Sequence, residues 1–236
     1  MPTGLNCKNE SDSRNRILKT RMTYVATIAA IRKVCKKINI SYSVGGDGRI
    51  ISAVKEKEYL DALVEGLKDE HPYTVCEIPK DRHWYDIRIN NIPINLKITK
   101  GGTDNAFNKV AFLYTLTGLE VQKKNMNMNK WFEHVRTTPH KTERDRQTEY
   151  HYLVVDKDTG TILLKSILDI HTYKSNPANI FQINWKKEFK NIDYVTPEDK
   201  YRASLLELFG TVQKSIRQAI AGMDKFADAD LKKMFS

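Results

Sequence analysis

The stretch that decides the fold runs from His83 to Lys109 and reads HWYDIRINNIPINLKITKGGTDNAFNK. Two runs of alternating apolar and polar residues flank Asn90 and Asn91. Asparagine tolerates the positive φ angles that a two-residue type I′ turn requires, so the pattern predicts a β-hairpin. The predicted pairs are 86 with 95, 87 with 94, 88 with 93 and 89 with 92.

Strand alternation assigns the side chains of this hairpin to two faces. One of these faces is polar. It places Asp86 opposite Asn95, with their Cβ atoms about 4.5–5.5 Å apart, and Lys97 follows along the same face. An acid, an amide and a lysine are therefore predicted to form one small polar patch. The apolar face is expected to carry Tyr85, Ile87, Ile89, Ile92, Ile94 and Leu96.

Such a patch suits metal-assisted hydrolysis of a phosphodiester. Mg²⁺ prefers oxygen ligands and keeps several waters, so a carboxylate such as Asp86 can hold it. The metal would polarise a phosphoryl oxygen and lower the pKa of a bound water, and Lys97 could orient that water or stabilise charge. The same residues could instead form a surface Asp–Lys ion pair, which contributes at most about 1 kcal/mol.

The composition of the chain indicates a soluble globular protein. The chain has 236 residues, which is enough for one large domain or two small ones. Hydrophobic residues make up 40% of it and charged residues 29%. No apolar run approaches the roughly 20 residues that cross a membrane, and the polar N-terminus has no apolar segment of a secretory signal. We therefore expect an intracellular, cytoplasmic protein with no membrane partner.

Charge and cysteine content narrow the classes of partner and cofactor. The formal net charge of +10 favours a polyanionic partner, because each neutralised phosphate releases condensed counterions. The three cysteines are widely spaced, which argues against a disulfide framework. The scattered histidines have no cysteine close enough to complete a zinc set, so we expect no zinc site.

Periodicity and turn residues predict the remaining elements. Residues 123–149 lose periodicity and hold seven Lys/Arg against four Asp/Glu, so they are expected to be a solvated loop or a DNA-contacting arm. The apolar stripe of the last helix indicates either core packing or a dimer face. The expected elements are a flexible basic lead over 1–20, a helix over 23–38, a hairpin over 41–54, a helix over 55–70, a strand over 73–78, a helix over 110–121, two strands over 149–168 and a helix over 197–220.

Two blocks of the sequence resemble a known family. WYD, ending at Asp86, followed by NLK at Asn95–Lys97, resembles the signature of the PD-(D/E)xK nuclease superfamily. PINLKITKGGTDNAFNKVAFLYTLTG and NPANIFQINW resemble segments of type II restriction endonucleases, and the order of elements resembles EcoRV-like members. The resemblance implies one α/β (α+β) endonuclease domain over 21–236, with a restriction-endonuclease-like central mixed β-sheet flanked by helices.

The resemblance also implies roles for individual residues. Asp86 would be the principal metal ligand and Lys97 the catalytic lysine. Asn95 stands where the pattern usually has Asp or Glu, and it would be a weaker ligand. The superfamily often takes a glutamate from the preceding helix, which we assign to Glu65, with Glu58 and Asp61 as rivals.

An uncharged Asn95 leaves three explanations open. The metal is held with fewer charges, another acid such as Asp104 enters the site, or an inactivating substitution was introduced at residue 95. The residues around Asn95 resemble family sequences in which Ile-Asn is followed by a hydrophobic residue and then Lys. This resemblance favours a natural asparagine at residue 95.

The segment after Lys97 is expected to contact DNA. Its lysines can meet phosphates, Gly101 permits close approach of the backbone, and its asparagines can bond adenine edges or phosphates. The alternative is a loop capped by its own amides. The candidate DNA-binding residues are Lys100, Gly101, Asn105, Asn108, Lys109 and Gln182, with Asn184 and Lys186 as weaker candidates.

The function implied is a type II restriction endonuclease that uses Mg²⁺ to hydrolyse double-stranded DNA at a specific site. A homodimer would cut both strands of a palindrome, in a prokaryotic cytoplasm and paired with a DNA methyltransferase. The alternatives are a less specific repair nuclease of the same fold and a non-catalytic DNA-binding protein with a degenerate site.

Overall fold

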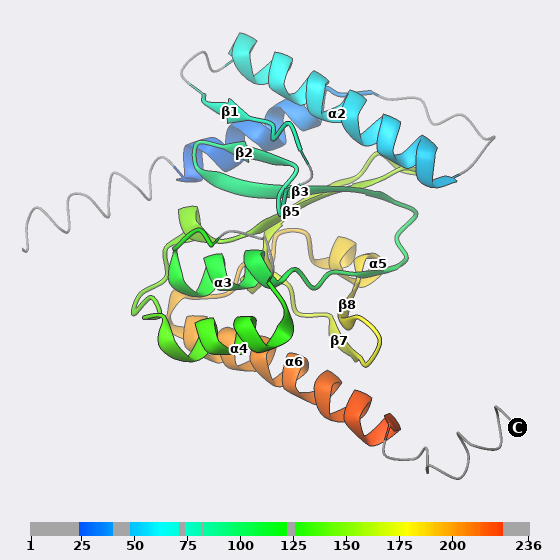
Figure 1. Ribbon diagram of the computed structural model, residues 1–236. Helices are drawn as coiled ribbons and strands as arrows, with labels where there is room; N and C mark the ends of the chain where they lie inside the picture. The colour runs from blue at the N-terminus through cyan, green and yellow to red at the C-terminus, as the bar shows by residue number, and fades with distance from the viewer. Residues whose placement is uncertain (1–23, 40–47, 71–73, 82, 122–125, 224–236) are drawn as a thin grey trace, which may run out of the picture.

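The computed structural model of the chain describes residues 24–39, 48–70, 74–81, 83–121 and 126–223 (Figure 1). The predicted lead over 1–20 and the first part of the predicted hairpin, over 41–47, lie outside these residues. Residues 24–35 form the first helix described. The other helices are α2 (Gly48–Glu70), α3 (Lys109–Thr117), α4 (Met128–Thr137), α5 (Trp185–Glu188) and α6 (Tyr201–Met223), and the short 3-10 turns are η1 (Arg146–Thr148), η2 (Ile167–Asp169), η3 (Phe189–Asn191) and η4 (Glu198–Lys200).

A five-stranded mixed sheet forms the centre of the fold, as expected. Its order is β1-β2-β3-β5-β6, in which β3 and β5 run parallel and the other neighbours run antiparallel. A separate three-stranded antiparallel sheet, here called the small sheet, has the order β4-β8-β7. The strands are β1 (Cys76–Glu77), β2 (Ile87–Ile89), β3 (Ile92–Thr99), β4 (Thr103–Asn105), β5 (His151–Asp156), β6 (Ile162–Ser166), β7 (Tyr173–Asn176) and β8 (Ile180–Asn184).

The predicted hairpin between β2 and β3 is confirmed. Asn90 and Asn91 have φ angles of 46° and 69°, as a type I′ turn requires. Residues 87, 88 and 89 pair with 94, 93 and 92, so the register is also the predicted one. The fourth predicted pair, 86 with 95, is not part of the ladder. The chain bends over residues 84–86, and the backbone N–H of Asp86 donates to the Ile94 carbonyl at 2.9 Å.

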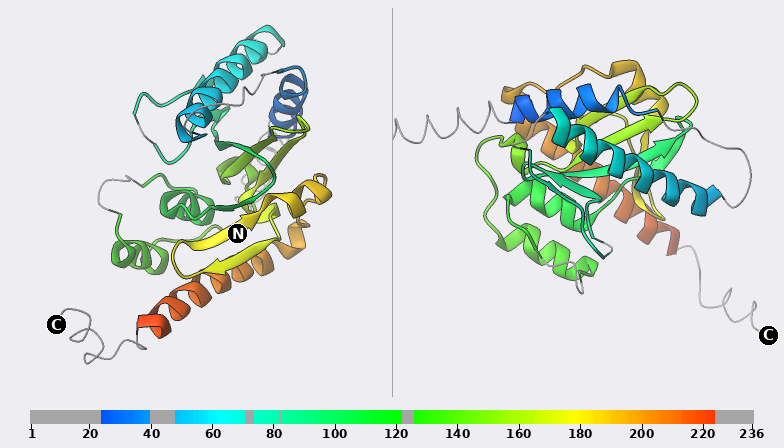
Figure 2. Two further views of the ribbon diagram at one scale, coloured as in Figure 1. Left: turned by 90° about the vertical axis from the view of Figure 1, so that its right-hand side faces the viewer. Right: turned by 90° about the horizontal axis from the view of Figure 1, so that it is seen from above.

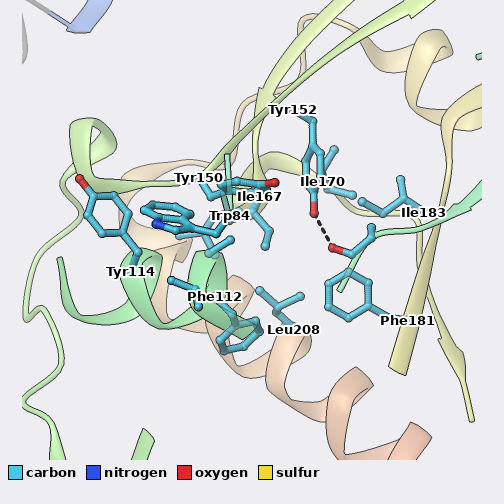
Figure 3. Packing of buried hydrophobic residues seen from close by; sticks show 14 of the residues in the cluster. Trp84, Phe112, Tyr114, Tyr150, Tyr152, Ile167, Ile170, Phe181, Ile183 and Leu208 are labelled. Carbon is cyan, nitrogen blue, oxygen red and sulfur yellow. Dashed lines mark hydrogen bonds between the residues drawn. The ribbon is translucent and has the colours of Figure 1, made fainter. Parts of the chain in front are cut away.

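Two hydrophobic clusters cover the two faces of the central sheet. One joins helix 24–35 and α2 to the isoleucines of β2 and β3 and to Leu153. The other contains Trp84, Phe112, Tyr152 and residues of α6 (Figure 3). In Figure 2 (left), α2 and helix 24–35 lie above the sheet, with α3, α4 and α6 below.

Tyr85 lies in the second cluster, so its predicted place with the isoleucines was wrong. The bend before β2 interrupts the alternation on which that prediction depended. Residues 87–96 keep the predicted alternation, because their backbone is continuous β-structure apart from the turn.

Two other element predictions were wrong in part. Residues 48–54 were expected to form the second strand of a hairpin, but α2 begins at Gly48 and continues to Glu70. Residues 128–137 of the expected loop form α4, which Asn127 caps by accepting a hydrogen bond from the Lys130 N–H. The predicted strands over 149–168 and the last helix are confirmed as β5, β6 and α6. Among the described residues, no helix combines the length and the apolar character of a membrane span.

Candidate active site

Asp86 and Asn95 meet through their side chains at the end of the β2–β3 hairpin. The Asn95 Nδ2 donates to Asp86 Oδ2 at 2.6 Å, and the Leu96 backbone N–H donates to the same oxygen at 2.8 Å. Two donors therefore hold one carboxylate oxygen of Asp86 in place. The predicted contact between these two side chains is present, although the backbone pairing expected to produce it is not.

The helical acid nearest to Asp86 is Glu56 of α2, which the sequence analysis missed. Burial raises the pKa of the Glu56 carboxyl above its ordinary value, and the negative charge of Asp86 raises it further. The charge of Lys97 and a hydrogen bond from the Ile98 backbone act in the opposite direction. Glu56, Asp86 and Lys97 are thus close enough to interact electrostatically.

The environment of Asp86 resembles that of Glu56. Burial raises the pKa of the Asp86 carboxyl, while the hydrogen bond from the Leu96 backbone and the charge of Lys97 oppose the increase. Asn95 and Lys97 alternate with the buried Ile94 and Leu96, which places them on the face of β3 opposite to the isoleucine cluster. The predicted convergence of Asp86, Asn95 and Lys97 is therefore present.

These acids open onto a cleft of about 660 Å³ between α2 and the segment that leads into β2. Its lining includes Glu56 and Asp61 from α2, His83 from the segment before β2, and Asp86 with Asn95. Lys97 is not among the lining residues, so its influence on the two acids comes from beside the cleft. The cleft gives Glu56 and Asp86, here called the cleft acids, access to a ligand.

Glu65 does not belong to this site, so its assignment was wrong. Its side chain is 71% exposed and pairs with Lys68 at 3.6 Å. Glu58 is similarly engaged with Lys55 at 2.7 Å, whereas Asp61 lines the cleft.

The position of Glu56 follows from the helical period. Leu60, Leu63 and Leu67 form the buried stripe of α2, and Glu56 lies on that stripe one turn before Leu60. A carboxylate in line with an apolar stripe was the signal that could have identified it. Glu65 lies off this stripe and faces solvent.

Asp104 of β4 lies near the site, as one explanation of Asn95 required. Its charge contributes to the raised pKa of Glu56, and its Oδ2 accepts a hydrogen bond from the Trp185 indole at 2.7 Å. Asp104 therefore adds negative potential beside the cleft acids.

Two of the candidate DNA-binding residues have structural roles in α3. Asn108 is the N-cap, since its Oδ1 accepts from the Val110 and Ala111 N–H groups, and its Nδ2 donates to the Trp84 carbonyl. Lys109 donates to the Met126 carbonyl at 3.2 Å. Of the two alternatives for this segment, the amide-capped loop describes Asn108.

The other candidates lie on or near the small sheet. Asn105 and Gln182 are paired positions of β4 and β8, and Gln182 Nε2 donates to Asn105 Oδ1 at 3.1 Å. Lys100 is exposed, and Gly101 has a φ of 77°, which suits glycine, in the loop that packs against Lys186. Asn184 caps α5 by accepting from the Lys187 N–H.

The donor set of the cleft fits a hard cation that takes few of its ligands from the protein. Among the described residues, no group of three or more His, Cys, Asp or Glu side chains is placed to hold a metal. Two carboxylates, however, satisfy Mg²⁺, which usually takes one or two carboxylates and completes its shell with waters and substrate phosphates. The raised pKa values of the cleft acids indicate that their negative charge is incompletely compensated.

A second group of buried charges lies away from the cleft, and we call it the Arg144 cluster. Arg144 donates to Glu149 at 2.7 Å, to Asp169 at 2.9 Å and to the Thr196 carbonyl at 2.6 Å. Arg146 also contacts Asp169, at 3.3 Å. The hydrogen-bonding capacity of this cluster is used internally, so it has the character of a structural network.

Comparison with known proteins gives no family assignment, because no family model matches the chain and no curated protein matches it at a significant level.

Proposed function

We propose that this protein is a Mg²⁺-dependent endonuclease that hydrolyses phosphodiester bonds in double-stranded DNA at a specific site, as type II restriction enzymes do. The observation that carries the proposal is the convergence of Glu56, Asp86 and Lys97 beside an open cleft. Acids whose pKa values are raised by burial in a cleft, next to a specific charge partner, are typical of catalytic sites.

In this proposal the cleft acids hold the metal. Burial raises the pKa values of both acids, and the charge of Asp86 raises that of Glu56 further, whereas a divalent cation would favour the ionised form of both. When bound, Mg²⁺ polarises the scissile phosphate and acidifies an attacking water. Asn95 donates a hydrogen bond from its side-chain amide to Asp86 Oδ2 and so orients the carboxylate.

Lys97 would act on the substrate side of the reaction. Its ammonium group contributes positive charge next to the cleft acids, where a phosphate must approach two carboxylates. Such a charge lowers the cost of bringing the phosphate in and stabilises the charge that develops during water attack. A net charge of +10 supports a DNA substrate in the same way, over a longer range.

The remaining parts of the proposal follow from the family resemblance. A two-fold dimer would cut both strands of a palindrome, the enzyme would act in a prokaryotic cytoplasm, and a DNA methyltransferase would protect the host sites.

Incubation of the purified protein with plasmid DNA tests the proposal directly. With Mg²⁺ we expect discrete fragments with common ends, and with EDTA we expect no cutting. Lys97→Ala should abolish cutting and leave DNA binding near normal, whereas Lys68→Ala, which removes an exposed lysine of α2, should cut normally. Normal cutting by Lys97→Ala would exclude the lysine from the mechanism.

A second candidate function is a DNA-binding protein without nuclease activity. The observation that favours it is Asn95, which brings no charge to a position where an acid would strengthen the metal site. Sequence-specific binding with no cutting in Mg²⁺ or Mn²⁺ would support this candidate, and a smear of fragments would instead indicate a less specific nuclease.

A further inference from the structure

The small sheet presents a polar outer face that the catalytic site does not use. Its inner face is identified by Ile183 and Phe181, which are fully buried. Paired residues of adjacent strands point to the same side, so the positions that alternate with Ile183 and Phe181 point outward. The outward positions are Thr103, Asn105, Lys174, Asn176, Gln182 and Asn184, whereas Ile180, at the start of β8, packs against the core.

The centre of this face is a row of three side chains, here called the outer row. Asn105 of β4 pairs with Gln182 of β8, which pairs with Lys174 of β7. Gln182 Nε2 donates to Asn105 Oδ1 at 3.1 Å, which orders the two amides relative to each other. The remaining amide donors and the Gln182 carbonyl oxygen stay available for a ligand.

The outer row has the charge of a surface that meets a polyanion. The six outward positions of the three strands carry no carboxylate, while Lys174 is exposed at one edge. Lys186 and Lys187, which follow β8 directly, are also exposed. This combination of amides and lysines complements nucleic acid, in which acceptor and donor groups lie between lines of phosphates.

The β7–β8 hairpin is held rigidly from below by α6. The buried Ser215 of α6 accepts a hydrogen bond from the Asn176 N–H at 3.0 Å and donates to the Ile180 carbonyl, so it joins both ends of the turn. Ile180 has a φ of 70°, which a β-branched residue rarely adopts. Strain of this kind persists where the surroundings fix the backbone, and it is frequent at binding sites.

β4 links the outer row to the surroundings of the cleft. Asp104, the neighbour of Asn105 in β4, points inward, bonds Trp185 and influences the Glu56 carboxyl. In Figure 2 (left), β7 and β8 lie on the side of the molecule turned to the viewer, between α2 above and α6 below.

We infer that the outer row enters the major groove of double-stranded DNA and reads base edges, with Gln182 and Asn105 directed at adenine. The major groove admits a β-ribbon, and Asn and Gln side chains bond adenine N6 and N7 bidentately. Lys174 contacts a neighbouring phosphate. The inference rests on the proposed function, because it assigns the sequence specificity of the same enzyme to these three side chains.

Selection from a pool of duplexes with random sequence tests the inference by binding alone. The probe protein is the full chain with Lys97→Ala, so that the pool is not cut. We expect this protein to enrich a short motif containing A·T pairs. Gln182→Ala in the same background should bind that motif at least about 10-fold more weakly and relax the preference at one base pair. Gln182→Glu should shift the preference there toward cytosine, since a carboxylate accepts from cytosine N4.

Gln213→Ala is the matched control, because it removes an exposed amide from α6. It should enrich the same motif with unchanged affinity. Melting temperatures of all variants check folding, and Asn105→Ala provides a second test if Gln182→Ala does not fold.

Three outcomes would overturn the inference. In the first, Gln182→Ala and Asn105→Ala both enrich the same motif with unchanged affinity. In the second, the Lys97→Ala protein enriches no motif. In the third, the Gln213→Ala control loses as much affinity as Gln182→Ala. The first and third outcomes leave the nuclease proposal untouched, whereas the lack of an enriched motif would also count against its site specificity; the plasmid digest separates the two cases, because it measures cutting directly. Site-specific cutting with unchanged specificity in both row variants would place the reading surface elsewhere.

Discussion

The Arg144 cluster and the cleft acids differ in how far their buried carboxylates are compensated by positive charge. In the Arg144 cluster, burial alone would raise the pKa of Glu149, but the hydrogen bond and charge of Arg144 lower it. In the cleft, burial and neighbouring acids raise the pKa of Glu56, and Lys97 compensates only in part. Removing one partner from a fully paired set of buried charges destabilises the protein, whereas charges left under-compensated at a cleft retain affinity for a ligand.

The largest effect is expected from breaking the closed network. Glu149→Gln should lower the free energy of unfolding by about 3–5 kcal/mol, because it leaves the buried Arg144 without its main counter-charge. Urea unfolding followed by circular dichroism measures this. A loss below about 1 kcal/mol would mean that the cluster is not the structural network described above.

The same change of acid to amide in the cleft should impair DNA cleavage rather than the free energy of unfolding. Glu56→Gln should reduce DNA cleavage by about 100-fold or more, since even outer partners of metal ligands affect activity 10- to 100-fold. Its free energy of unfolding in metal-free buffer should stay the same or rise slightly, because a repulsion with Asp86 is removed. Initial rates of plasmid cleavage and urea unfolding test both parts, and full activity would exclude Glu56 from the site.

Opposite pKa shifts predict opposite dependence of stability on pH. The pKa of Glu56 is raised in the folded protein, so its ionisation destabilises the fold as the pH rises above the ordinary value of 4.5. The pKa of Glu149 is lowered, so its contribution is present above 4.5 and is lost as the pH falls below that value.

Unfolding experiments in metal-free buffer between pH 3 and 7 (about the range in which carboxyls titrate) measure this difference. The gap in stability between Glu56→Gln and the unchanged protein should widen as the pH rises. The gap between Glu149→Gln and the unchanged protein should close as the pH falls. Parallel pH profiles for the two variants would contradict the comparison.

A smaller effect is expected at Asn108, which caps α3 and also lines the cleft. Asn108→Ala should lower the free energy of unfolding by about 1 kcal/mol through loss of the α3 cap. Cleavage per folded molecule should be unchanged if the side chain is spent on the cap and on Trp84. Loss of cleavage with normal stability would restore Asn108 as a DNA contact.

The smallest effect is expected at Glu65. Glu65→Gln changes an exposed acid of the same helix as Glu56, so it should alter the free energy of unfolding by less than about 0.5 kcal/mol and leave cleavage unchanged. It is therefore the control for Glu56→Gln. A drop in cleavage equal to that of Glu56→Gln would show that α2 carries its acids in a different register.

The strand part of the site was predictable because the strand period is short and strict. Asn90-Asn91 fixed the turn, and two-residue alternation then placed Asn95 and Lys97 on one face of β3. The mixed sheet with flanking helices also followed the expectation. Tyr85 was misplaced because a bend before β2 is set by tertiary packing, which alternation does not register.

The helical part was harder to predict for a physical reason. Acids occur all around α2, so the family pattern could be satisfied by several of them, and the choice depended on where the helix begins. The expected hairpin over 41–54 replaced the first turns of α2, so the helix was expected to begin at residue 55, next to Glu56. The small sheet combines β4 with β7 and β8, far along the chain, and no local pattern predicted that pairing.

Helix 24–35 has a consequence for how the chain folds. Tyr24 hydrogen-bonds His151 at 2.9 Å and Arg32 donates to the Leu164 carbonyl at 3.2 Å, so its partners follow more than a hundred residues later. During synthesis its contacts with β5 and β6 can form only after most of the chain has left the ribosome. Its contacts with α2, including the ion pair of Lys33 with Glu70, join residues much closer in the chain and can form earlier.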